Sequence, residues 1–155
     1  MRHLCIDLGD KRTGLAVGDT VTGLVSPLDV LEVPVARNAG GDLLAAIGKA
    51  VAGQGPMALV IGLPYNMDGT EGPRAKSVRE FADRIAKATG LPVRFQDERL
   101  TSADADWTMA QSGLTHGQKK ARRDALAAAA ILRDYLQTLS PPARPSSTLP
   151  PDVNP

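Results

Sequence analysis

The sequence predicts an α/β fold in which an antiparallel N-terminal hairpin leads into parallel strands. The first observation is a pair of short apolar runs on either side of the polar stretch 10–13, typical of two strands joined by a turn. The second is the continuously apolar run 57–62, typical of a parallel strand that is covered on both faces. The third is a helical apolar period just before that run, which indicates the crossover helix that a parallel strand needs.

The hairpin contains the first residue that needs a chemical explanation. Gly9 and Gly14 flank its turn, and both are able to adopt positive φ angles there. Asp7 lies at the end of the first apolar run, where an ionised carboxylate is costly unless a cation or several donors compensate it. Asp7 therefore either caps the turn through the backbone or binds a cation, and the hairpin alone leaves both interpretations open.

The following segments extend the sheet and cover it. Residues 23–33 indicate a third strand, in which Pro27 favours a sheet edge or a bulge. A helix is expected to begin at Asp42, which is a suitable N-cap. After the buried run, a second amphipathic helix is expected to stop at Gly90, and 91–96 forms a further strand.

The C-terminal part is predicted to complete the domain and to end in a tail outside it. We expect a helix over 104–111, a loop over 112–118 and a last helix that turns Asp124 inward. Residues 1–139 are thus expected to form the domain. Residues 140–155 are rich in proline and serine, cannot build a core, and are expected to form a disordered tail.

Composition excludes several classes of protein. The 155 residues carry a formal net charge of +1, which excludes a globally basic nucleic-acid binder. Cys5 is the only cysteine, so a disulfide scaffold is excluded and a reducing, cytoplasmic setting is expected. No signal pattern and no apolar run of membrane-spanning length occur, so we expect no membrane partner.

Three acids are predicted to meet at one end of the sheet. Asp7 ends the first strand, Glu98 follows the last strand, and Asp124 enters on the inward face of the last helix. Three unpartnered carboxylates would repel one another, and a divalent cation resolves the conflict. Oxygen ligands favour Mg²⁺ or Mn²⁺, and a pair of such ions can activate water against a phosphodiester and stabilise the leaving oxygen. The acids therefore predict metal-dependent phosphodiester hydrolysis.

Four segments resemble, in order, the motifs of the YqgF/RuvX family, which is described both as Holliday junction resolvases and as pre-16S rRNA nucleases. These segments are 6–14, 62–72, 97–102 and 120–128. The resemblance covers residues 1–139. It implies an RNase H-like fold, with a mixed five-stranded sheet flanked by helices on both faces, and metal-dependent cleavage. The family's acid triad corresponds to the same three acids, as catalytic residues and metal ligands.

Basic and polar side chains near these motifs are candidates for contact with nucleic acid, and a solvated surface role is the alternative for each. The candidates are Lys11, Arg12, Asn66, Arg99, Thr101, Lys119, Lys120 and Arg122.

Three functions agree with these observations. The first is an endonuclease that processes the 5′ end of pre-16S rRNA during ribosome biogenesis. Its partners would be precursor rRNA and ribosome assembly intermediates, and it would act as a monomer or weak homodimer. The second is a Holliday junction resolvase that cuts branched DNA as a dimer. The third is a regulatory factor that binds nucleic acid and holds structural Mg²⁺ without turnover.

Overall fold

The computed structural model describes residues 1–99 and 116–139, and side chains over the same ranges except 116–121. Its elements are β1 (Arg2–Leu8), β2 (Thr13–Asp19), β3 (Val25–Leu31), η1 (Arg37–Gly40), α1 (Gly41–Gln54), β4 (Ala58–Leu63), α2 (Pro73–Thr89), β5 (Val93–Asp97) and α4 (His116–Leu139). The predicted helix over 104–111 and the predicted tail over 140–155 lie outside the described residues.

The five strands form one mixed sheet in the order β3-β2-β1-β4-β5. β1, β2 and β3 are antiparallel neighbours, whereas β4 runs parallel to both β1 and β5. β3 is an edge strand, and the register against β2 shifts because Leu15 pairs with Asp29 while Ala16 pairs with Pro27. The predicted α/β fold with a mixed sheet is confirmed, as is the irregularity at Pro27.

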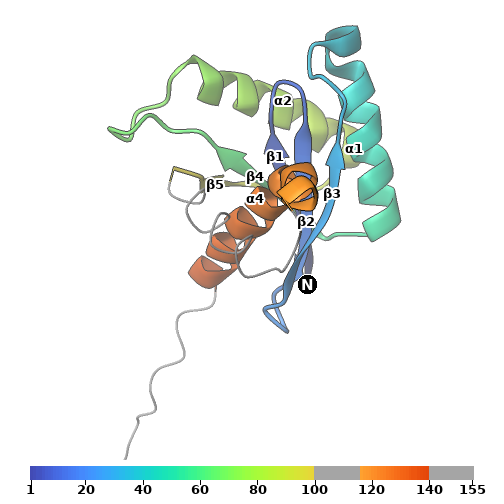
Figure 1. Cartoon of the computed structure of the whole chain (residues 1–155), viewed down its shortest axis with the longest axis vertical. Helices are drawn as coiled ribbons and strands as arrows, with labels where there is room; N and C mark the ends of the chain where they lie inside the picture. Colours follow the sequence, from blue (N-terminus) through green and yellow to red (C-terminus); the bar gives the residue numbers. More distant parts are fainter. Residues whose placement is uncertain (100–115, 140–155) are drawn as a thin grey trace, which may run out of the picture.

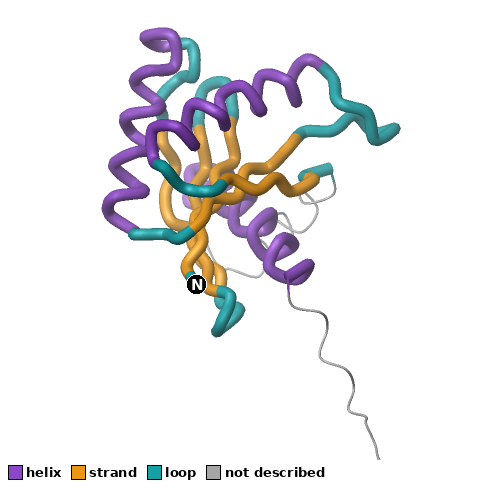
Figure 2. The backbone as a smooth tube through the Cα atoms, turned by 180° about the vertical axis from the view of Figure 1, so that it is seen from behind, coloured by secondary structure: helices purple, strands orange, loops and turns teal. Residues whose placement is uncertain are grey.

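Helices cover both faces of the sheet (Figures 1 and 2). On one face, α1 and α2 bury their apolar stripes against alternate residues of the central strands, such as Leu4, Ile6 and Ile61. On the other face, α4 packs its small apolar side chains against Cys5 and Val60, among others. Alternation of side chains along β1 therefore sends odd-numbered residues toward α4 and even-numbered residues toward α1 and α2.

Helix boundaries confirm the predicted stop at Gly90 and correct two predicted starts. The C-caps of α1 and α2 are Gly55 and Gly90, which both adopt the left-handed conformation with φ of 61° and 72°. Asp42 is not the N-cap of α1, because the left-handed Gly40 takes that position and Asp42 lies in the first turn. The loop predicted over 112–118 is wrong at its end, because α4 already begins at His116.

None of the described helices combines the length and the apolar character needed to cross a lipid bilayer.

Candidate functional site

Asp7 is positioned by β1 on the face of the sheet that α4 covers. It lies one residue before the strand ends and pairs with Gly14 of β2. Its side chain shares this face with Cys5, which is fully buried under α4. Asp7 is itself partly buried, so its carboxyl group lies at the margin of the core and within reach of the sheet end.

Glu98 reaches the same place from the far edge of the sheet. It follows β5 directly, and its backbone N–H donates to the carbonyl oxygen of Leu63 at 3.4 Å. Its side chain crosses Gly62, where a Cβ atom would lie 2.5 Å from Oε2. The side-chain carboxyl groups of Asp7 and Glu98 share a hydrogen bond. The structure therefore brings these two predicted residues into direct contact.

The electrostatics of this pair favour one retained proton. Burial raises the pKa of Asp7 to about 8, and the negative charges of Glu98 and Asp124 act in the same direction, whereas Arg74 opposes them. Burial also raises the pKa of Glu98, while the hydrogen bond from Asp7 and the charge of Arg74 lower it. Two neighbouring carboxylates in a partly buried site repel each other when both are ionised. A proton retained between Asp7 and Glu98 reduces this repulsion, as a cation would.

Asp124 lies close enough for its charge to act on Asp7, but its carboxylate has another partner. The guanidinium Nε of Arg12 donates to Asp124 Oδ2 at 3.1 Å, and both side chains are partly exposed to solvent. As arranged, no group of three or more His, Cys, Asp or Glu side chains among the described residues could hold a metal ion. The three acids thus lie at one end of the sheet, with Asp7 and Glu98 joined and Asp124 set apart by Arg12.

The donor set fits a hard divalent cation by its chemistry. Asp7, Glu98 and Asp124 offer only carboxylate oxygens, the ligands that Mg²⁺ and Mn²⁺ prefer. A cation held by Asp7 and Glu98 would replace their shared proton, and Arg12 would compete with that cation for the Asp124 carboxylate. The residues therefore fit a metal site in which one ligand also binds an arginine.

The predicted nucleic-acid contacts lie in several different environments. Lys11 and Arg122 are exposed, on the β1–β2 turn and on α4, and Arg12 is bound to Asp124. Lys119 and Lys120 belong to α4, but their side chains lie outside the described part of the chain. Thr101 lies outside the described residues altogether.

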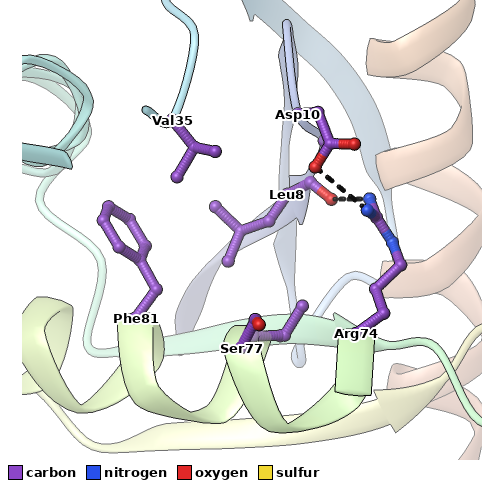
Figure 3. A pocket seen from close by; sticks show the side chains of 8 residues that line it. Leu8, Asp10, Val35, Arg74, Ser77 and Phe81 are labelled. Carbon is purple, nitrogen blue, oxygen red and sulfur yellow. Dashed lines mark hydrogen bonds and ion pairs between the residues drawn. The ribbon is translucent and has the colours of Figure 1, made fainter. Parts of the chain in front are cut away.

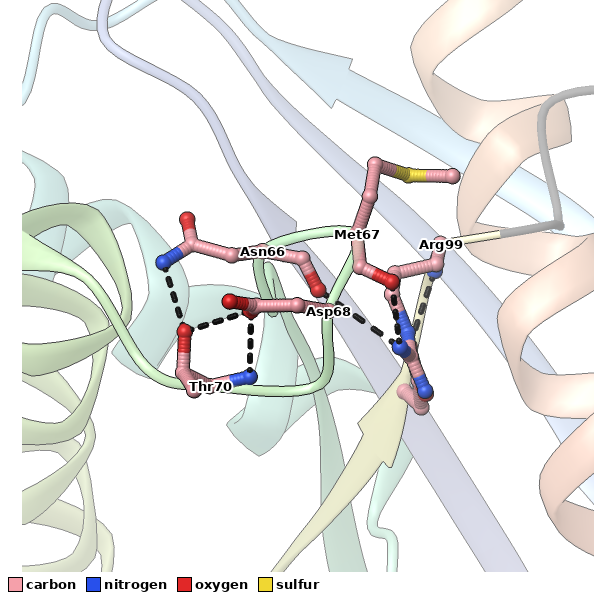
Figure 4. Close-up of polar contacts among 6 residues, drawn as sticks. Asn66, Met67, Asp68, Thr70 and Arg99 are labelled. Atoms are coloured by element: carbon pink, nitrogen blue, oxygen red, sulfur yellow. Dashed lines mark hydrogen bonds and ion pairs between the residues drawn. The ribbon is translucent and has the colours of Figure 1, made fainter.

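Arg99 and Asn66 hold the loop between β4 and α2, which projects from the sheet end (Figures 1 and 4). Arg99 donates two hydrogen bonds to Asp97, with Nε–Oδ2 and Nη2–Oδ2 distances of 2.8 and 2.6 Å. Its remaining terminal nitrogen donates to the carbonyl oxygens of Asn66 and Met67 at 3.5 and 3.4 Å. The Asn66 side chain donates to Thr70 Oγ1 at 3.0 Å. Both side chains thus have structural partners, and their contact with phosphate stays a prediction.

Sequence reasoning missed the reason for the glycines of the site. Gly9 and Gly14 are able to adopt positive φ angles, but neither does so. They are required because a Cβ atom would collide with backbone: with the Arg12 carbonyl at Gly9, and with the Asp124 carbonyl at Gly14. A glycine inside a strand pattern is the sequence signal that could have indicated such close approaches. Gly14 in 13–19 and Gly62 in 58–63 are examples.

The fold places the chain in the RNase H-like class. It is similar to Thermus thermophilus RuvC in a structure described as "T. thermophilus RuvC in complex with Holliday junction substrate". The TM-score is 0.61 at 19% identity, and the match covers 90% of this chain and 97% of that one. At this identity the likeness establishes the fold alone.

The particular family follows from sequence. The family model described as "RuvX: Holliday junction resolvase" matches residues 1–138, and the chain belongs to this family of nucleases. A relative from Anaeromyxobacter dehalogenans, named "Putative pre-16S rRNA nuclease", is 40% identical over 91% of this chain and 100% of its own length. A Rhodobacter capsulatus protein of the same name is 40% identical over 87% of this chain and 82% of its own. The resemblance stated from the four motifs is confirmed.

Proposed function

We propose that the protein is a metal-dependent endonuclease that hydrolyses phosphodiester bonds and processes the 5′ end of pre-16S rRNA. The observation that carries the proposal is the contact between Asp7 and Glu98 at a sheet end that Asp124 also faces. Membership of a nuclease family supports the reaction, and the names of the curated relatives support the rRNA substrate. The cytoplasm, where ribosomes assemble, is the expected location. Residues 1–139 are proposed as the nuclease domain, with 140–155 as an appended segment.

Each acid has a distinct part in the proposed site. Asp7 and Glu98 would hold Mg²⁺ or Mn²⁺ between them from the rigid sheet, and Asp124 would complete the ligand set from α4. Such an ion, when bound, supplies an activated water and stabilises the leaving oxygen of a phosphodiester. Lys11 and Arg12, on the exposed turn next to the acids, would contact the phosphates of the substrate.

A second candidate substrate is a four-way DNA junction, because the matching family model carries that description. Symmetric cleavage of a junction needs two active sites at a defined separation, and therefore a dimer. Processing of an rRNA end needs one active site and is compatible with a monomer. The oligomeric state in solution, measured by light scattering, thus helps to separate the two.

The test is a cleavage assay on precursor 16S rRNA and on a four-way DNA junction, with Mg²⁺ or Mn²⁺ and with EDTA. Asp7→Asn, Glu98→Gln and Asp124→Asn should each remain folded and lose at least about 100-fold in cleavage rate. Even the outer partners of metal ligands cost 10- to 100-fold, so loss of a ligand should cost no less. Asp83→Asn is the matched control, because Asp83 is an exposed acid on α2 and far from the proposed chemistry in sequence.

Cleavage by Asp7→Asn at the wild-type rate, after removal of contaminating nucleases, would contradict the proposed site. Cleavage of the junction in preference to the rRNA precursor would favour the second substrate. Binding of nucleic acid without cleavage under every metal condition would instead favour a regulatory factor.

A further inference from the structure

Arg74 links the beginning of α2 to the end of β1 (Figure 3). One terminal nitrogen of its guanidinium donates to the carbonyl oxygen of Leu8 at 3.2 Å. The other donates to Asp10 Oδ1 at 3.1 Å. Arg74 therefore contacts both the strand end and the turn that follows it, through two donors set at a fixed angle.

These two contacts bear directly on Asp7, because Leu8 is the next residue along the chain. The position of the Leu8 carbonyl therefore fixes the backbone directly after Asp7. The turn beyond it is tight and has no room for a side chain at Gly9. Arg74 holds this turn from the side of α2, while Arg12 holds it to Asp124 of α4 on the other side. The turn is thus anchored to both helical layers.

The charge of Arg74 also acts on the acidic pair. Its positive charge lowers the pKa of both Asp7 and Glu98. Arg74 lines a pocket of about 60 Å³ together with Leu8, Val35 and Phe81, among others. This volume is far below the 300 Å³ or more that a small-molecule ligand needs. We therefore assign the role of Arg74 to its contacts with the β1–β2 turn.

We propose that Arg74 is a positioning residue of the metal site, which orients Asp7 by holding the Leu8 carbonyl and the Asp10 carboxylate. The inference rests on the proposed function, since it assumes that Asp7 binds the ion. The direction of the change in metal affinity on removal of Arg74 separates an effect of position from an effect of charge. A cation near a metal site repels the metal, so removal of charge alone would tighten metal binding. Loss of orientation would weaken it.

The experiment is titration calorimetry of the full-length protein with Mn²⁺, without nucleic acid. Arg74→Gln should weaken Mn²⁺ binding by about 10-fold or more, as loss of an outer partner of a metal ligand does. Arg74→Lys keeps the charge but not the two-pronged geometry, and it should also weaken binding. Asp10→Ala removes one of the two contacts and should give a smaller loss of the same sign. Lys76→Gln is the matched control, because Lys76 is exposed on the same helix turn.

Unchanged or tighter Mn²⁺ binding by Arg74→Gln, with Lys76→Gln equal to the wild type, would overturn the inference. A lower melting temperature with unchanged Mn²⁺ affinity would also overturn it, because the role would then be structural only. If Arg74→Gln does not fold, Mn²⁺ binding by Arg74→Lys and Asp10→Ala tests the inference instead. Asp7→Asn separates the two proposals: if it too binds Mn²⁺ normally, the proposed site itself is wrong.

Discussion

Arg12 and Arg74 contact the same β1–β2 turn but relate to the acids in opposite ways. Arg12 donates to the carboxylate of Asp124, a candidate ligand, and therefore competes with any cation for it. Arg74 donates to the Leu8 carbonyl, in the backbone that directly follows Asp7. Two residues of the same type should thus affect metal binding with opposite signs.

At this scale we predict that Arg12→Gln tightens Mn²⁺ binding by about two- to fivefold. The pair is exposed to solvent, and exposed ion pairs are worth up to about 1 kcal/mol, which corresponds to roughly a fivefold change in affinity. Calorimetric titration with Mn²⁺ measures the change. The same variant should bind rRNA precursor more weakly at low salt, because a candidate phosphate contact is removed. Weaker Mn²⁺ binding would contradict the competition.

Among the elements, α4 approaches two of the central strands most tightly at positions where the strands have no side chain. Gly14 of β2 lies against the backbone of Asp124 on α4, and Gly62 of β4 lies under Glu98 and Ile131. A Cβ atom at Gly62 would lie 2.8 Å from Ile131 Cδ1 as well as close to the Glu98 carboxylate. The two glycines therefore allow the acids of three different elements to share one small region.

We predict that Gly14→Ala displaces α4 from β2 and reduces both stability and cleavage. The obstacle is backbone, which cannot rotate away as a side chain can, and overpacking of this kind costs about 1–3 kcal/mol. Urea unfolding measures the loss. Gly48→Ala is the control, because the space around Gly48 in α1 is open and alanine favours a helix by up to about 1 kcal/mol. Equal stability of Gly14→Ala and the wild type would show that the close approach does not hold in solution.

Over the whole molecule, folding and protonation are coupled through the site. The pKa of Asp7 is raised from 3.8 to about 8, so the folded protein retains a proton that the unfolded chain releases. The folded state therefore binds more protons between these values, and its stability falls as pH rises through the window. Glu98 and Asp124 strengthen this effect, and Arg74 weakens it.

The matching prediction concerns the metal-free protein in EDTA between pH 6.5 and 8. Its free energy of unfolding should decrease by about 1 kcal/mol per pH unit, the slope for most of one proton. His3, whose pKa is lowered from 6.5 by burial, binds more protons in the unfolded chain near the lower end of this range and therefore opposes the slope there. The Cys5 thiol keeps its proton because burial raises its pKa further. Denaturant unfolding at several pH values measures the slope. Asp7→Asn should flatten it, and an unchanged slope in that variant would assign the proton elsewhere.

Features of the fold that depend on local pattern were predictable. β4 is recognisable because every one of its residues is apolar and buried, and α2 because its apolar stripe ends at Gly90. The start of α1 was not predictable in this way. Asn38, at φ of 52°, donates a side-chain hydrogen bond to the Asp42 carboxylate. The N-cap position of α1 is occupied by Gly40 instead of Asp42.

The sequence by itself determined the fold class and the sheet end at which Asp7 and Glu98 meet, because parallel neighbouring strands carry their final residues to one edge. It also indicated that Asp124 faces inward, because Ala128 and Ile131 share its helical stripe and are buried. Only the tertiary structure decided which partner each charge takes. Arg12 meets Asp124 across 112 residues of chain, and such a contact depends on ångström-scale packing of α4 over Gly14 that no local pattern encodes.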